Sequence, residues 1–226
     1  MYRLLVASGA HGLDPLLTLA EQRGIRVEML NRRELDARAG DHHQGVAAEA
    51  EPFAYAHLDD IFSRAGEGGS PPLLLALDSL QDPQNFGTLL RTAQACGTHG
   101  VLIPAHRAVG VTPAVSNASA GAVEHLLVTQ VTNLARALGE LKSRGVWVYG
   151  LAVEADQSFW DADLTGPMAL VVGSEGSGLG RLVRERCDAL VNIPMVPGAV
   201  QSLNVSVAGS LVLYEVLRQR RQSVTS

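Results

Sequence analysis

The predicted fold depends on two stretches, ALVVGSEGSGLG at residues 169–180 and VNIPMVPGAVQSLNVSVAG at residues 191–209. In each, a short apolar run is joined to a loop rich in glycine or polar residues, and these loops carry Glu175 and Asn204. Open α/β sheets bind ligands beyond the carboxyl ends of their strands, so polar side chains there predict a ligand site. A third junction of this kind, LLLALDSLQDPQNFG at residues 73–87, predicts that three loops form one site.

The pattern around these junctions predicts a mostly parallel α/β sheet, because apolar strands alternate with amphipathic helices. We expect strands at 73–78, 100–104, 125–131, 146–153, 169–173 and 189–194, and helices at 84–96, 112–121, 132–144, 179–185 and 204–220. Upstream, shorter strands at 3–8, 25–30 and 45–50 and helices at 13–22, 31–38 and 57–64 predict a small α/β domain. The stretch AGEGGSPP concentrates glycine and proline and predicts a linker. The expected division is a domain at 1–64, a linker at 65–72 and a second domain at 73–226.

Composition limits the classes of protein that this chain can belong to. A hydrophobic content of 46% suits a packed core and excludes general disorder. No apolar run approaches the roughly 20 residues that span a bilayer, so we expect no membrane segment. Cys96 and Cys187 lack metal-ligand spacing, and no histidine motif suggests zinc, so we expect no metal and a cytoplasmic location. The net charge of −5 gives no global sign of nucleic-acid binding.

Arg91 is the basic residue best placed to act at the predicted site. It lies in the second turn of the helix that begins near Gln84, four residues after Gly87. Helical side chains lean toward the N-terminus, and a glycine there leaves an open lane along which the guanidinium could reach the preceding loop. Such an arginine can grip a carboxylate or phosphate, or it can pair with Asp78, Asp82 or Glu175 for structure alone. These two readings are equally supported by the sequence.

The last predicted helix carries one apolar stripe, formed by Leu203, Val207, Leu211, Tyr214 and Leu217. This spacing is typical of a helix face that packs against the core. Arg218, Arg220 and Arg221 near its end favour the helix dipole. Other chemistries fit poorly, since the chain has no P-loop, no GxGxxG order and no GxSxG elbow.

Three motifs in order and spacing resemble those of the SpoU, or TrmH-like, RNA 2′-O-ribose methyltransferases. They are DPQNFGTLLRTA (82–93), LVVGSEGSGL (170–179) and IPMVPGAVQSLNVSVA (193–208). Within this family the chain is most similar to enzymes that methylate a guanosine of 23S rRNA, because VTNLARAL (131–138), GLAVEAD (150–156) and HQGV (43–46) also agree. The resemblance covers residues 73–220.

The resemblance implies a sheet with a C-terminal trefoil knot of the SPOUT type, a homodimer, and S-adenosylmethionine as cofactor. It implies an RNA-binding-like N-terminal domain, here shortened, because the opening strand and helix of that domain are not found before RLLVAS. The implied cofactor-binding residues are Leu151, Gly173, Ser174, Gly176, Ile193, Pro194, Met195, Ser202 and Leu203. The implied catalytic residues are Asn85, Arg91, Glu175 and Asn204.

The resemblance assigns Arg91 as the base that deprotonates the ribose 2′-hydroxyl. An arginine has almost no neutral form at neutral pH. Either the RNA phosphate and neighbouring groups cooperate, or Arg91 stabilises the developing alkoxide and orients the phosphate. The expected partner is 23S rRNA. Alternatives are a tRNA or an rRNA adenosine as substrate, or a catalytically silent RNA-binding paralogue.

Overall fold

The computed structural model describes residues 1–40, 43–198 and 201–225, and the chain forms two compact units. Contacts divide it into Met1–Ala54 and Tyr55–Ser226. This division lies before the expected linker at 65–72, which falls inside the second unit. The physical reason is helix α3 (Leu58–Gly68), whose buried Ile61 and Ala65 pack it into the second unit. The Gly- and Pro-rich stretch instead ends this helix at Gly69, in a left-handed conformation, and leads into the first strand of the next sheet.

The first unit is a small three-stranded sheet with a helix on each face. Its elements are β1 (Arg3–Ala7), α1 (Asp14–Gln22), β2 (Arg26–Leu30), α2 (Arg32–Ala39) and β3 (Val46–Glu49). The strand order is β2-β1-β3, with β1 parallel to β2 and antiparallel to β3. Successive residues of β1 face opposite sides, so Leu4 packs in the core that includes Ala20 of α1, and Leu5 packs with Leu35 of α2.

The second unit contains a seven-stranded sheet. Its strands are β4 (Leu73–Leu77), β5 (Gly100–Pro104), β6 (Leu127–Val131), β7 (Trp147–Leu151), β8 (Gln157–Ser158), β9 (Met168–Val172) and β10 (Ala189–Asn192). Between them lie α4 (Pro83–Ala95), α5 (Pro113–Ala118), the 3-10 turn η1 (Ala122–His125), α6 (Leu134–Ser143) and α7 (Arg181–Arg184), and α8 (Val205–Thr225) ends the chain. The order β6-β5-β4-β9-β7-β10-β8 is parallel at every recorded pairing. All five residues of β4 are buried, as expected for a strand covered on both faces.

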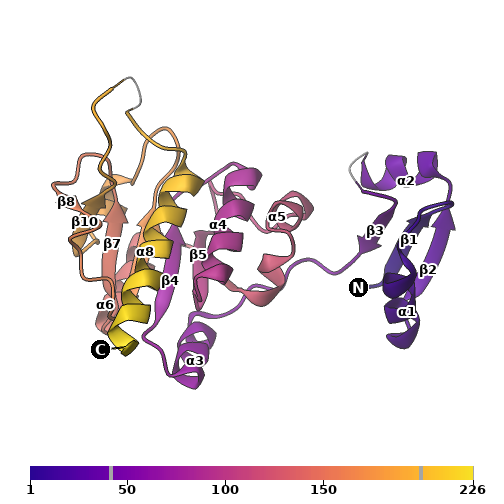
Figure 1. Cartoon of the computed structure of the whole chain (residues 1–226), viewed down its shortest axis with the longest axis horizontal. Helices are drawn as coiled ribbons and strands as arrows, with labels where there is room; N and C mark the ends of the chain where they lie inside the picture. Colours follow the sequence, from indigo (N-terminus) through magenta and orange to yellow (C-terminus); the bar gives the residue numbers. More distant parts are fainter. Residues whose placement is uncertain (41–42, 199–200, 226) are drawn as a thin grey trace. The chain divides into compact units, whose positions relative to one another are not determined.

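Helices cover both faces of this sheet (Figure 1). Leu74 and Ala76 point to the face that packs against α3, α6 and α7. Val172 points to the other face, where it lies against Gly209 of α8, and α8 in turn packs along α4. The predicted mostly parallel α/β domain, preceded by a small α/β domain, is therefore confirmed.

The order of the strands places the predicted loops side by side. Because all strands run in one direction, the segments after β5, β4, β9, β7 and β10 leave the sheet at the same edge. Strand β9 follows β7 in the chain but lies between β4 and β7, so the chain returns to the middle of the sheet before β10 and α8. This return is consistent with the expected C-terminal knot.

Candidate active site

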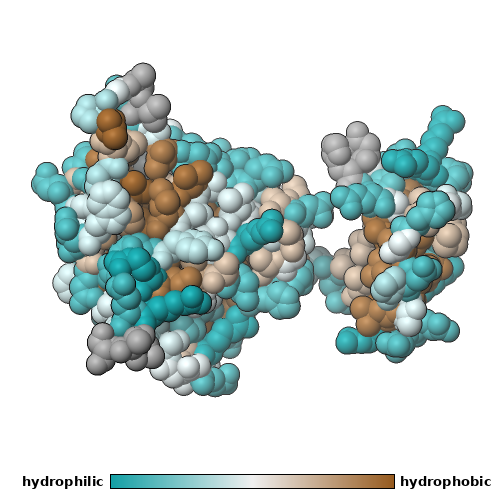
Figure 2. Space-filling model, in the orientation of Figure 1, coloured by the Kyte–Doolittle hydropathy of each residue, from teal (hydrophilic) through white to brown (hydrophobic). Residues whose placement is uncertain are grey.

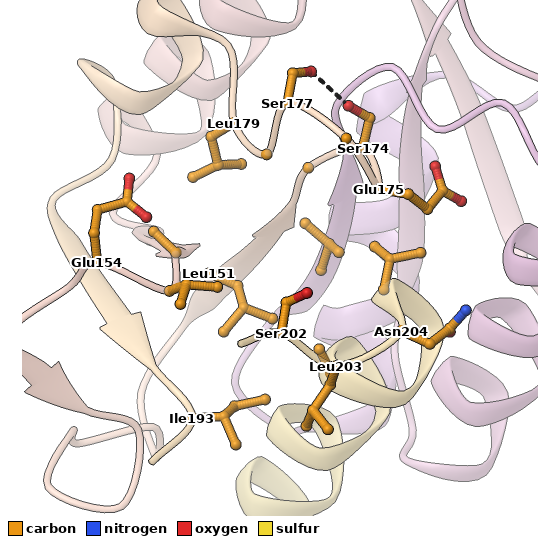
Figure 3. A pocket seen from close by; sticks show the side chains of 18 of the residues that line it. Leu151, Glu154, Ser174, Glu175, Ser177, Leu179, Ile193, Ser202, Leu203 and Asn204 are labelled. Atoms are coloured by element: carbon orange, nitrogen blue, oxygen red, sulfur yellow. Dashed lines mark hydrogen bonds between the residues drawn. The ribbon is translucent and has the colours of Figure 1, made fainter. Parts of the chain in front are cut away.

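A cavity of about 600 Å³ opens at the carboxyl edge of the large sheet. Its wall comes from the segments after β7, β9 and β10 and from the beginning of α8 (Figure 3). Leu151, Ile193 and Leu203 form apolar parts of the wall, while the loop from Gly173 to Leu179 supplies polar and main-chain groups. The volume lies in the usual range for small-molecule sites. Apolar walls with a few polar groups suit a flat heterocycle with polar substituents.

The loop after β9 folds back tightly on itself. Ser174 and Gly178 exchange two backbone hydrogen bonds, of 3.1 and 3.0 Å. The hydroxyls of Ser174 and Ser177 form a further hydrogen bond of 2.8 Å across the loop. A Cβ on Gly173 would lie 2.2 Å from the carbonyl carbon of Gly178 and 2.5 Å from the nitrogen of Leu179. Glycine is therefore required at position 173 by space, because backbone atoms occupy the place of a side chain.

Asp78 ties this loop to the end of β4. Its Oδ2 accepts a 2.7 Å hydrogen bond from the backbone N–H of Gly180, and its Oδ1 accepts one from the hydroxyl of Ser79. Ser79 has a φ of +62°, a left-handed conformation that is uncommon outside glycine. This role of Asp78 was not predicted from the sequence. Asp78 directly follows a buried strand, and this position could have indicated its role.

Asn85 and Glu175 meet at the edge of the cavity. The amide nitrogen of Asn85 donates a 2.7 Å hydrogen bond to Oε1 of Glu175, across a separation of 90 residues in the chain. Asn85 is positioned by Asp82, whose carboxylate caps the beginning of α4 by accepting from the N–H groups of Gln84 and Asn85. The structure thus joins two of the four predicted catalytic residues directly.

Asn204 reaches the same end of the cavity from the beginning of α8. Its Oδ1 accepts hydrogen bonds from the backbone N–H and the hydroxyl of Ser206 and from the N–H of Val207, which caps the helix. Its amide nitrogen has no partner in the described part of the chain. Figure 3 shows Glu175 and Asn204 on one side of the cavity and Glu154 on the opposite side.

Arg91 lies exposed on α4 and makes no ion pair or hydrogen bond with any described residue. The structural pairing with Asp78, Asp82 or Glu175 that the sequence left open is therefore not formed. The open lane expected beside Gly87 is also wrong. A Cβ on Gly87 would lie 2.4 Å from Cβ of Ala118 and 2.8 Å from its carbonyl carbon, so α5 fills the space. Gly87 allows two helices to approach closely, and the Arg91 guanidinium remains available on the surface.

Eight of the nine predicted cofactor-binding residues line the cavity, and Pro194 does not. The eight are Leu151, Gly173, Ser174, Gly176, Ile193, Met195, Ser202 and Leu203. Glu154 and Arg184 were not predicted as site residues from the sequence. They form an ion pair in the cavity wall. A hydrogen bond from its own backbone N–H, followed by one from Arg184, holds the pKa of Glu154 below its ordinary value.

Within residues 1–40, 43–198 and 201–225, no group of three or more histidine, cysteine or acidic side chains could hold a metal ion. In the same residues, no helix is both long enough and apolar enough to cross a membrane.

Comparison with known proteins agrees with this geometry. Residues 72–214 match the SpoU rRNA Methylase family, and residues 1–56 match the family described as RNA 2'-O ribose methyltransferase substrate binding. The sheet, with its cavity and glycine-rich loops at the carboxyl edge, is thus that of an RNA methyltransferase. The chain is a member of the SpoU rRNA methylase family, and the predicted resemblance is confirmed.

Individual relatives cover most of the chain. It is 49% identical over 205 residues to the putative TrmH family tRNA/rRNA methyltransferase YacO of Bacillus subtilis, covering 91% of this chain and 82% of the relative. It is 49% identical over 210 residues to the 23S rRNA (guanosine-2'-O-)-methyltransferase RlmB of Ralstonia nicotianae, covering 92% of this chain and 83% of that protein. Among solved structures, the SpoU methyltransferase AviRb from Streptomyces viridochromogenes, in complex with AdoMet, matches with a TM-score of 0.82. That match has 26% identity and covers 97% of this chain and 83% of AviRb.

Proposed function

We propose that this protein transfers a methyl group from S-adenosylmethionine to the 2′-oxygen of a guanosine ribose in 23S rRNA. The observation that carries the proposal is a cavity built from glycine-rich loops, with Asn204 and Glu175 on one side of it and Glu175 hydrogen-bonded to Asn85. Relatives named for 23S rRNA guanosine-2'-O-methylation are 44 to 49% identical to this chain over more than nine-tenths of its length. They support rRNA as the substrate over tRNA.

The cavity has the chemistry to hold S-adenosylmethionine. Leu151, Ile193 and Leu203 offer apolar contact to an adenine ring, and the Gly173–Leu179 loop offers main-chain donors and acceptors to its polar edge. When bound, the cofactor supplies a methyl group on a positively charged sulfur, which an oxygen nucleophile can displace. The structure of AviRb in complex with AdoMet, with a matching fold, supports this assignment.

The polar residues at the end of the cavity would align the ribose. Glu175, held by Asn85, presents a carboxylate that can accept a hydrogen bond from a ribose hydroxyl. The unpartnered amide nitrogen of Asn204 can donate to a ribose or phosphate oxygen. Holding the oxygen in line with the methyl group is a large part of the rate enhancement open to such a site.

Arg91 would act through its permanent positive charge. An arginine guanidinium stays charged at neutral pH, so it can stabilise negative charge that develops on the 2′-oxygen or lies on the adjacent phosphate. Because it has no partner within the described chain, this charge is not already neutralised. We expect Arg91→Ala to abolish most turnover and to leave cofactor affinity within a few-fold of wild type.

We also propose that the protein is a cytoplasmic homodimer. Leu203, just before helix α8, and Val207, Leu211 and Tyr214 on this helix are 36 to 56% exposed. Figure 2 shows hydrophobic residues gathered over this helix. A contiguous exposed apolar stripe is typical of an interface. Light scattering tests the dimer: Leu211→Asp is expected to yield monomers, and a monomeric wild-type protein would contradict it. Both cysteines are free, which suits a reducing compartment.

The test of the function is transfer of labelled methyl to unmodified 23S rRNA and unmodified tRNA, with Arg91→Ala measured in parallel. We expect label in 23S rRNA at an alkali-resistant linkage, and none with the variant. Label in tRNA alone would show that the protein methylates tRNA and not 23S rRNA, by the same chemistry. Cofactor binding without label in either RNA would support the silent RNA-binding paralogue, and loss of cofactor binding in wild type would refute the assignment.

A further inference from the structure

The loop after β5 presents two exposed basic side chains at the same sheet edge as the candidate site. His106 and Arg107 are exposed, and neither makes a hydrogen bond or ion pair with a described residue. Arg107 has a φ of +61°, so a bulky residue holds a left-handed conformation that costs free energy and is uncommon outside glycine. The Arg107 side chain is thus held at a strained position and has no hydrogen bond or ion pair within the described chain, so its charge is available to a ligand.

This loop is fixed on both sides of its tip. The N–H of Ala105 donates to the carbonyl of Val131 at 2.9 Å, and the N–H of Val109 donates to the carbonyl of Leu80 at 2.9 Å. Beyond the tip, the N–H of Val111 donates a 3.0 Å hydrogen bond to the hydroxyl of Tyr55. Only residues 106–108 project, from a base held to the neighbouring strands. A charged side chain on such a base is positioned before its ligand arrives, which lowers the entropic cost of binding.

The topology places this tip beside the residues that would hold the ribose. Strand β5 is the direct neighbour of β4, and β4 is the direct neighbour of β9. The segments that follow them carry, in the same order, Arg107, Asn85 in the first turn of α4, and Glu175. The contact from Val109 to Leu80 joins the first two loops. Neighbouring strands are about 4.8 Å apart, so the Arg107 loop lies roughly one strand spacing beyond the loop that leads to Asn85.

Arg107 differs from several other arginines of the second unit in having no partner for its guanidinium among the described residues. Arg144, Arg184 and Arg218 are each paired with a carboxylate, and Arg220 is used by backbone carbonyls. An acidic chain with net charge −5 must rely on local cations to hold a polyanion. At the carboxyl edge of the sheet, Arg107 is such a cation.

We propose that Arg107, supported by His106, grips an RNA phosphate flanking the nucleotide whose ribose lies at Asn85 and Glu175. This inference rests on the proposed function, since it takes RNA as the ligand. Arg107 is a positioning residue: it sets the register of the RNA strand and does not touch the reacting atoms. A guanidinium suits the task because it can donate two hydrogen bonds to the oxygens of one phosphate.

The test compares Arg107→Gly with Arg107→Lys and with the control Arg136→Ala. Glycine adopts the left-handed conformation without strain and also removes the positive charge. If Arg107 served only to form the turn, Arg107→Gly would be at least as stable as wild type and would bind RNA equally well. Arg136 is a matched control because it is exposed on α6, which packs on the opposite face of the sheet from α4 and α8, and because its guanidinium has no hydrogen bond or ion pair with a described residue. The measurements are affinity for a 23S rRNA fragment across a series of salt concentrations, kcat and KM for RNA, and cofactor affinity.

We expect Arg107→Gly to weaken RNA binding by about three- to ten-fold, as for one exposed charge-assisted contact. The slope of log K against log salt should become shallower by about 0.7 to 0.9. KM for RNA should rise, with kcat within two-fold and cofactor affinity unchanged, and Arg107→Lys should keep most of the slope. Unchanged binding in Arg107→Gly, an equal loss in Arg136→Ala, or a fall in kcat at constant KM would each overturn the proposal. Failure of the proposed function would show differently, as wild-type protein that binds RNA without methylating it.

Discussion

Replacing Gly173 by alanine tests the loop that forms the cavity. A Cβ at this position would lie 2.2 Å from the carbonyl carbon and 2.3 Å from the oxygen of Gly178, and 2.5 Å from the nitrogen of Leu179. These are backbone atoms, so no side-chain rotation relieves the clash. To bring the contacts beyond about 3.4 Å, the loop must open by more than an ångström, which would break the two hydrogen bonds between Ser174 and Gly178.

The size of the effect follows from these contacts. Two backbone hydrogen bonds contribute about 0.5–1.5 kcal/mol each, and overpacking in a closed site costs about 1–3 kcal/mol. We therefore expect the free energy of unfolding to fall by about 2–6 kcal/mol. The cofactor would lose the shaped wall at the same time, and we expect its Kd to rise at least tenfold, which corresponds to about 1.4 kcal/mol.

The assay is isothermal titration with S-adenosylmethionine alongside urea denaturation. The matched control is Gly176→Ala, in the same loop and also in the cavity wall, where a Cβ would meet no atom within 4 Å. The control should retain wild-type stability, and any loss of affinity should be smaller than in Gly173→Ala. A Gly173→Ala protein with wild-type Kd and wild-type stability would refute the reasoning that close backbone approach dictates this glycine.

Two further predictions concern the opposite end of the sheet. Arg220 donates to the carbonyls of Pro71 and Gly166 at 2.7 Å, so Arg220→Met should lower the free energy of unfolding by about 1–3 kcal/mol by removing these charge-assisted hydrogen bonds; urea denaturation with no change would contradict this. His99 has a pKa lowered by burial and then by Arg220, while its Nδ1 accepts from the N–H of Leu73. The unfolded chain takes up a proton on this histidine near pH 6.5, and the folded chain does so at a lower pH. The contribution of His99 to the free energy of unfolding should therefore be complete above about pH 6.5 and decline below it, by at most about 1.4 kcal/mol per pH unit. His99→Asn should flatten that decline in pH-dependent denaturation, and an unaltered slope would exclude His99 as its source.

Sequence periodicity predicted most of the secondary structure because strand and helix patterns are local. The two-residue strand β8 and the 3-10 turn η1 were missed, since neither is long enough to show a period. The sequence also predicted that the three polar junctions form one site, because parallel strands leave the sheet at one edge. Asp78, Glu154 and Arg184 were missed because their partners are distant in the chain.

The last helix shows where local patterns fail. Leu203, Val207 and Leu211 were expected to pack against the core, and that expectation is wrong, because these side chains are exposed. The buried face is formed by Val205, Val212, Leu213 and Val216. Helix α8 therefore has two apolar faces, and the spacing of apolar residues does not say which one meets the sheet.

Arg220 shows the same limit for charges. As a cation near a helix end it was read as favouring the helix dipole. Its role depends on carbonyls at Pro71, Pro72 and Gly166, which only the folded chain brings together. Burial among these groups also lowers the pKa of Arg220, whereas an arginine exposed at a helix end would not be desolvated.

The most direct test of the central claim is the identity of the methylated nucleoside. Unmodified 23S rRNA would be incubated with the protein and S-adenosylmethionine, digested to nucleosides and analysed by mass spectrometry. The account predicts 2′-O-methylguanosine, present with wild-type protein and absent with Arg91→Ala. A guanosine methylated on its base, or 2′-O-methylguanosine formed equally well by Arg91→Ala, would contradict it.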